Sequence, residues 1–145
     1  MTPKRILVPL KGTAGDEAVL SAVAPAAREV GATLRLLHVA PVPHNLVSES
    51  GRVVMYADQE MGRLDAHWSA YLAGVAATLH DSAVEYVVRF GDPVHEIVAE
   101  AEAWGAELLA MTIARPQRFG WRGLRRVAAA VPRKVRIPVL LYQVP

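Results

Sequence analysis

Apolar residues follow two alternating patterns along the chain. Short continuous apolar runs, typical of strands buried on both faces, cover Lys4–Leu10, Thr33–Val39, Ala83–Arg89, Glu107–Thr112 and Ile137–Tyr142. Stretches with apolar residues every three or four positions separate these runs, and this spacing predicts four helices. Strands that alternate with helices predict a single α/β domain over residues 1–145, with a parallel, doubly wound sheet and right-handed crossovers.

Residues at the ends of the first helix give it predicted boundaries. Thr13 is a predicted N-cap, with Asp16 three residues later as the acidic partner of a capping box. Gly31 is expected to end this helix. Pro25 lies inside it, so we expect a kink or a break there.

Later helices carry similar signals. Asp92 is a predicted N-cap with Pro93 at the first helical position, and Gly105 is the expected end of that helix. The last helix is predicted from about Trp121 to Val131 with Pro132 closing it, and the polar stretch Pro41–Arg52 is predicted to be a loop.

Composition places the chain among globular proteins. Hydrophobic residues make up 52% and charged residues 21% of its 145 residues, a balance opposite to that of disordered chains. No apolar run approaches the roughly 18 residues of a membrane span, and the N-terminal run is too short for a secretion signal. The chain has no cysteine, so disulfides and thiolate metal sites are excluded. We therefore expect a cytoplasmic protein without a membrane partner.

Charge is distributed unevenly. All fourteen acidic residues lie at or before Glu107, together with eight of the sixteen basic residues, so this part sums to −6. The remaining 38 residues carry eight basic residues and sum to +8. Such a basic region can attract an anionic ligand, a nucleic acid or an acidic partner, or it can be a solvated helix face.

The order of these motifs resembles the universal stress protein family over essentially the whole chain. The residues that carry the resemblance are Arg5–Leu10 followed by Gly12 and Thr13, Leu36–Val39, Gly91–Pro93 with Ile97, Glu107–Met111, and Val127 to Leu141. The resemblance implies a Rossmann-like sheet, similar to that of adenine nucleotide alpha hydrolases, with strand order 3-2-1-4-5. It also implies homodimers paired through the last strand and, in one subgroup of the family, an ATP site.

The family's ATP signature, Gly-x2-Gly-x9-Gly-Ser/Thr, does not occur here. Its four positions fall on Thr112, Arg115, Arg125 and Arg126, and Lys11 stands where the family usually has an acidic residue. Glycine is needed at such positions because backbone N–H groups must approach the phosphates closely. We therefore expect no cofactor, and ATP in the usual mode is disfavoured.

An alternative use of the same region is an arginine-lined anion or nucleotide pocket at the point where the strand order reverses. Its candidate residues are Leu10, Lys11, Gly12, Thr13, Val39, Thr112, Arg115, Arg118, Arg125 and Arg126. The competing interpretation is that these arginines pair with carboxylates or lie across apolar surface. Trp121 and Phe119 near the basic helix are candidate stacking groups for nucleic acid, but they are expected to pack the helix, so nucleic acid is not an expected partner.

The sequence offers no catalytic or metal motif. The five histidines lack the His-x3-His spacing of a helical zinc pair, and no serine lies in a Gly-x-Ser-x-Gly context. We therefore expect a protein that is not an enzyme and has no metal site.

The last strand predicts self-association. Its apolar residues Val139, Leu140, Leu141 and Tyr142 belong to a strand at the sheet edge in the implied order, guarded only by Pro138. Such an edge favours pairing with a second copy, unless the Pro41–Arg52 loop or the long helix predicted from the spacing of apolar residues between Met61 and Leu79 covers it. The sequence thus predicts a universal stress protein-like, non-catalytic binding or regulatory domain that acts as a homodimer in stress response. The alternative is a protein that binds ATP, AMP or another phosphate ligand in the arginine-lined pocket.

Overall fold

A computed structural model describes residues 2–44, 46–47, 49–114 and 121–144 of the chain. The strands are β1 (Arg5–Pro9), β2 (Thr33–Ala40), β3 (Leu46–Val47), β4 (Val53–Met55), β5 (Ala83–Phe90), β6 (Leu108–Ala114) and β7 (Val139–Val144). The helices are α1 (Asp16–Val30), α2 (Ala57–Ala77), α3 (Pro93–Trp104) and α4 (Trp121–Lys134).

The five long strands form one parallel sheet in the order β5-β2-β1-β6-β7. The apolar runs predicted these five strands, and β5, β6 and β7 are the third, fourth and fifth of them along the chain. The predicted order 3-2-1-4-5 is therefore confirmed. The chain moves from β1 through β2 to β5 in one direction, then reverses to β6 and β7 on the other side of β1. The switch point, where open sheets of this type bind ligands, therefore lies at the carboxyl ends of β1 and β6.

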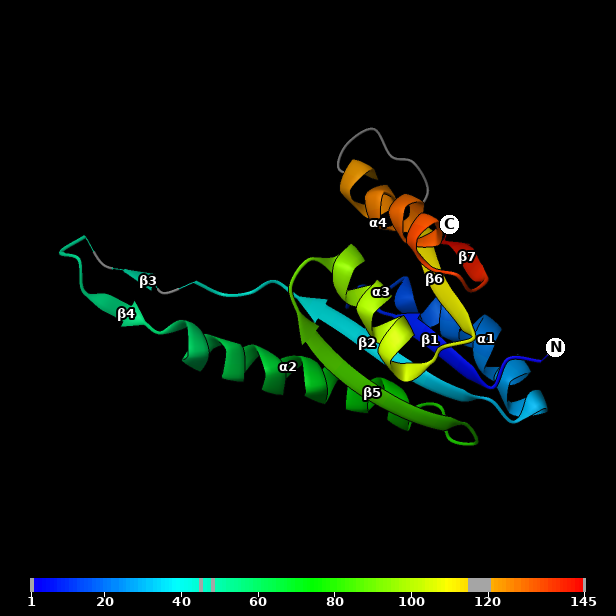
Figure 1. Ribbon diagram of the computed structural model, residues 1–145. Coiled ribbons are helices and arrows are strands. Elements are labelled where there is room, and N and C mark those ends of the chain that lie inside the picture. The colour runs from blue at the N-terminus through cyan, green and yellow to red at the C-terminus, as the bar shows by residue number, and fades with distance from the viewer. Residues whose placement is uncertain (1, 45, 48, 115–120, 145) are drawn as a thin grey trace.

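Helices cover both faces of this sheet (Figure 1). Alternate strand residues point to opposite faces, so β1 contributes Ile6 and Val8 to the core beneath α1 and α2, and Leu7 to the core beneath α3 and α4. Leu7 and Val8 are both completely buried. Burial on both faces explains why the strands are continuous apolar runs in the sequence.

The start of α1 differs from its prediction. Gly15 is the N-cap and no side chain caps the helix, so the prediction of Thr13 as N-cap is wrong. Asp16 instead turns back and accepts hydrogen bonds from the backbone N–H groups of Lys11, Gly12 and Thr13. The helix continues through Pro25, which is exposed to solvent, and ends as predicted at Gly31 in the left-handed conformation.

The ends of α3 match their prediction and the end of α4 does not. The Asp92 side chain accepts a hydrogen bond from the His95 N–H, Pro93 is the first helical residue and Gly105 ends the helix. Helix α4 continues through Pro132 to Lys134, because the N–H of Val135 still reaches the Val131 carbonyl at 3.1 Å and completes the last turn.

The Pro41–Arg52 stretch is not entirely a loop. It contains β3, which pairs antiparallel with β4 through Val47 and Val53 on either side of a turn. β-Branched residues flanking a Ser-Gly turn favour such a hairpin. The hairpin and the first half of α2 extend away from the sheet (Figure 1). No helix within the described residues has the length and apolar content that crossing a membrane requires.

Candidate ligand cavity at the switch point

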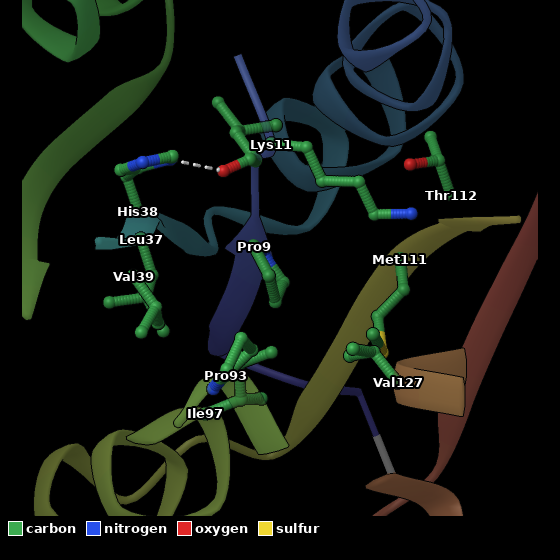
Figure 2. Close-up of a pocket in the computed structure, with 11 residues that line it drawn as sticks. Pro9, Lys11, Leu37, His38, Val39, Pro93, Ile97, Met111, Thr112 and Val127 are labelled. Atoms are coloured by element: carbon green, nitrogen blue, oxygen red, sulfur yellow. Dashed lines mark hydrogen bonds between the residues drawn. The ribbon is translucent and has the colours of Figure 1, made fainter. Parts of the chain in front are cut away.

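A cavity of about 270 Å³ lies at the carboxyl ends of β1, β2 and β6 (Figure 2). It is lined by Pro9, Leu10, Lys11, Leu37, His38, Val39, Pro93, Ile97, Met111, Thr112 and Val127. Ligand pockets commonly occupy roughly 300–1,000 Å³, so this cavity suits a small ligand. Its position is the one that the strand order assigns to ligand binding in open α/β sheets.

The wall of the cavity is mainly apolar because three strands and two helices direct aliphatic side chains into it. Val39 comes from the end of β2 and Met111 from the middle of β6, while Ile97 comes from α3 and Val127 from α4. Figure 2 shows these side chains around the end of β1, with Pro9 between them. An apolar wall with a few polar groups is the usual composition of a small-molecule site.

Asp16 holds the loop that follows β1. The Asp16 carboxylate is 1% exposed and accepts the N–H groups of Lys11, Gly12 and Thr13 at 3.2, 2.6 and 3.1 Å. The Tyr71 hydroxyl of α2 donates to the same carboxylate at 3.2 Å. Burial and the neighbouring Asp16 raise the pKa of Tyr71 to about 12. The backbone amides of this loop are thus already donated to an internal anion and are not free to bind a phosphate.

Lys11 is the cation of the cavity wall. Figure 2 shows its side chain extending from the end of β1 toward Thr112, which is 7% exposed. Burial lowers the pKa of Lys11, while the Asp16 carboxylate acts in the opposite direction. Within the part of the chain that the structure describes, the Lys11 ammonium makes no hydrogen bond and no ion pair, so it can receive an anionic group from a ligand.

His38 connects the cavity to α2. Its Nδ1 lies 2.8 Å from the Leu10 carbonyl oxygen, and its ring stacks on Trp68 with centroids 3.6 Å apart. Burial lowers the pKa of His38, while the Leu10 carbonyl and Asp16 act to raise it. A neutral ring must carry its proton on Nδ1, because the Leu10 carbonyl can only accept a hydrogen bond.

The structure brings together part of the predicted anion pocket. Leu10, Lys11, Val39 and Thr112 line the cavity, whereas Gly12 and Thr13 lie in the adjoining loop. Arg115 and Arg118 lie outside the described residues, and the side chain of Arg125 in α4 is not described. Whether any of these residues binds a ligand stays a prediction.

Arg126 has a protein partner. Its Nη2 lies 3.0 Å from Oδ1 of Asp92, the N-cap of α3, and both side chains are largely exposed. The predicted alternative, in which arginines pair with carboxylates, therefore describes Arg126.

Sequence reasoning missed several cavity residues. Seven lining residues are absent from the predicted site: Pro9, Leu37, His38, Pro93, Ile97, Met111 and Val127. Five of these seven (Pro9, Leu37, His38, Met111 and Pro93) lie near the end of a predicted strand or at the start of a predicted helix, a position that could have indicated them. The stacking of His38 on Trp68 had no sequence signal. Within the described residues, no group of three histidine, aspartate or glutamate side chains is placed to hold a metal ion.

The fold and the cavity define a doubly wound α/β domain with a cavity at its switch point. The model of the universal stress protein family matches residues 2–143, so the chain belongs to this family. No curated protein matches the chain.

Solved structures share the fold at low sequence identity. A hypothetical protein whose biochemical function was assigned from its structure has a TM-score of 0.76 and 22% identity, with 100% of this chain and 99% of that chain covered. A universal stress protein in complex with cAMP has a TM-score of 0.67 and 17% identity, covering 98% of both chains. An Arabidopsis thaliana universal stress family protein with AMP bound has a TM-score of 0.64 and 15% identity, covering 99% of this chain and 93% of that chain.

Proposed function

We propose that this universal stress protein binds a nucleoside phosphate in the switch-point cavity, without turning it over and without a glycine-based triphosphate loop. The observation that carries the proposal is the cavity itself, which joins an apolar wall to the Lys11 ammonium, a group without a hydrogen-bond or ion-pair partner among the described residues. A nucleoside suits the apolar wall, and a phosphate suits the ammonium.

Nucleotide binding by relatives supports the ligand class. One structural neighbour is a complex with cAMP and another has AMP bound. Thr112, Arg115, Arg125 and Arg126 stand at the four positions of the family's glycine signature. This difference supports a mode of phosphate binding that does not use the glycine loop. Arg126 is also engaged by Asp92.

The absence of turnover is supported by the chemistry of the described lining residues. Lys11, His38 and Thr112 are the ones among them with functional groups on their side chains. The His38 ring is held by the Leu10 carbonyl and Trp68, and neither contact supplies a nucleophile for the ring to activate.

We also propose that the protein acts as a homodimer paired through β7. This strand is at the edge of the sheet, next to β6, and Leu140 and Leu141 are 43% and 42% exposed. Exposed apolar residues on an unpaired edge favour strand pairing with a second copy. In this proposal the protein acts as a dimer in the cytoplasm during stress.

Thermal unfolding with AMP as the probe tests the ligand proposal. A ligand that binds only the folded protein raises its melting temperature, and AMP at 100 times its dissociation constant adds about 2.7 kcal/mol. Val39→Phe fills part of the cavity and is expected to remove the shift. Val42→Phe makes the same change at a half-exposed position that does not line the cavity, so it should keep the shift. An equal shift in both variants, or none in the unmodified protein, would contradict the proposal.

A further inference from the structure

The Lys11 amine differs from the other two lysine amines of the chain in its surroundings. Lys4 donates from its Nζ to the Val30 carbonyl at 2.6 Å, at the end of α1, and Lys134 is exposed at the end of α4. Lys11 is partly buried and lines the mainly apolar cavity at the switch point (Figure 2). The fold therefore directs one of the three lysines into apolar surroundings.

No acidic side chain pairs with the Lys11 ammonium in this cavity. All fourteen acidic side chains of the protein belong to described residues, and none of them forms an ion pair with Lys11. The Asp16 carboxylate accepts hydrogen bonds from three backbone N–H groups of the loop after β1 and from the Tyr71 hydroxyl instead. Figure 2 shows the Lys11 side chain extending toward Thr112, which carries no charge.

Burial increases the fraction of the amine that is neutral. It lowers the pKa of Lys11, and the charge of Asp16 on α1 offsets only part of this effect. Among the described lining residues, β2 adds His38, and those from β6, α3 and α4 add no titratable group. The basic residues beyond Glu107 can only lower the pKa further, because like charges disfavour the ammonium. A desolvated lysine in an apolar pocket is a nucleophile that forms imines with carbonyl compounds.

We propose that Lys11 captures small apolar aldehydes as reversible imines, with the hydrocarbon part of the aldehyde in the cavity. The neutral amine attacks the carbonyl carbon, and the carbonyl oxygen takes one amine proton to give a carbinolamine. That oxygen then leaves as water with the second amine proton, so a C=N bond forms and nothing is oxidised or reduced. The apolar wall favours a hydrocarbon body, and the volume of about 270 Å³ limits its size. This inference rests on the cavity and on Lys11, and it does not require nucleotide binding.

Reductive trapping with butanal as the probe tests the inference. Cyanoborohydride transfers hydride to the imine carbon and fixes the adduct, and peptide mass mapping then gives the label at each lysine. We expect several-fold more label on Lys11 than on Lys134 at pH 7, because each unit by which a pKa is lowered gives about ten times more free amine. The labelling of Lys11 should also level off at a lower pH than that of Lys134. Labelling of Lys11 that is equal to or below that of Lys134 would overturn the inference.

Variants of the cavity and a second aldehyde show whether the cavity holds the hydrocarbon part. Val39→Phe occupies part of the cavity and should lower the label on Lys11 several-fold, without changing that on Lys134. Val42→Phe, at a half-exposed position outside the cavity, should change neither. Glyceraldehyde, a polar aldehyde of similar size, should show a smaller preference for Lys11 than butanal does.

Unchanged labelling of Lys11 in a folded Val39→Phe protein would overturn the inference, and so would an equal preference for Lys11 with both aldehydes. Either result leaves the nucleotide proposal standing, because the thermal shift with AMP is measured without an aldehyde.

Discussion

Gly12 shows how closely α2 approaches the loop that carries Lys11. Its φ of 84° lies in the left-handed region that favours glycine, and a Cβ atom added there would lie 2.6 Å from Cζ3 of Trp68. The position is therefore restricted both by the backbone conformation and by the Trp68 ring. Trp68 also stacks on His38 of β2. One side chain of α2 therefore lies against the loop after β1, at Gly12, and against the end of β2.

We predict that Gly12→Ala destabilises the protein by about 2–4 kcal/mol, because left-handed backbone strain of about 1–2 kcal/mol adds to overpacking against Trp68. Urea unfolding measures this free energy. Gly31→Ala is the matched control, since Gly31 has a φ of 70° with no atom within 4 Å of the added Cβ, and it should cost only about 1–2 kcal/mol. Equal losses in the two variants would mean that the Trp68 ring moves aside freely.

His38 predicts a pH dependence of stability. Its pKa is lowered from 6.5, chiefly by burial, so the unfolded chain binds a proton more readily than the folded protein. This contribution to stability is present above pH 6.5 and is lost as the pH falls through the lower, folded-state pKa. The groups around the ring are Trp68, the Leu10 carbonyl, Asp16 and His67.

The expected result is a fall in the free energy of unfolding between about pH 7 and pH 5.5 in the unmodified protein, and a smaller fall in His38→Asn. The asparagine amide can still donate to the Leu10 carbonyl but does not titrate. Urea unfolding at the two pH values measures both slopes, and His95→Asn, at an exposed position in α3, is the control. A slope in His38→Asn as steep as in the unmodified protein would show that other groups set the pH dependence.

At the scale of elements, Glu100 joins α3 to two strands. Its carboxylate is 5% exposed and lies 3.1 Å from Nη1 of Arg35 on β2 and 3.3 Å from Nη1 of Arg89 on β5. Arg35 also lies 4.6 Å from the ring centroid of Trp104, the last residue of α3. Removing a buried carboxylate leaves two guanidinium groups without their shared partner.

We predict that Glu100→Ala destabilises the protein by about 3 kcal/mol, in line with the loss of one partner from a buried ion pair. Glu85→Ala removes the other carboxylate that contacts Arg35, but Glu85 is 45% exposed, so it should cost less than about 1 kcal/mol. Chemical denaturation of both variants gives the comparison. A loss in Glu85→Ala as large as that in Glu100→Ala would show that burial does not decide the value of these pairs.

Helices and strands were predictable from the sequence where their apolar residues or their end residues follow a pattern over many positions. The five parallel strands are apolar on both faces, and α3 has Asp92, Pro93 and Gly105 at its ends, so both were evident in the sequence. The two- and three-residue strands β3 and β4 are too short to show a period. Asp16 matched the pattern of a capping box, but the loop amides nearer to its carboxylate took its hydrogen bonds.

The site was predictable where it consists of strand ends. Leu10, Lys11, Val39 and Thr112 follow from the strand order, because the carboxyl ends of β1, β2 and β6 meet there. The contacts of Trp68 with His38 and of Tyr71 with Asp16 depend on how α2 crosses the sheet, and no local pattern specifies that. The partner of Arg126 is 34 positions away in the sequence and was equally hidden.

At the scale of the whole molecule, the two edges of the sheet differ. β5 is one edge and lies beneath α2, whereas β7 is the other and carries the exposed Leu140 and Leu141. Pairing through β7 would extend the sheet across two copies.

We predict that the protein is a dimer at micromolar concentration. The double substitution Leu140→Lys and Leu141→Lys should convert it to a monomer, because charges on an edge strand oppose pairing. Light scattering coupled to size exclusion measures the mass. Tyr86→Lys, at a 45% exposed position on β5, places a charge on the opposite edge and should leave the dimer intact. A monomeric unmodified protein would contradict the predicted pairing.

The cavity at the switch point gives the molecule its proposed role, and a crystal structure of the protein with AMP tests that role most directly. We predict electron density for the nucleoside between Val39 and Met111, with the phosphate within hydrogen-bond distance of the Lys11 ammonium. Density for a nucleotide whose phosphates are instead cradled by residues 112–126 in the family's usual manner would contradict the account.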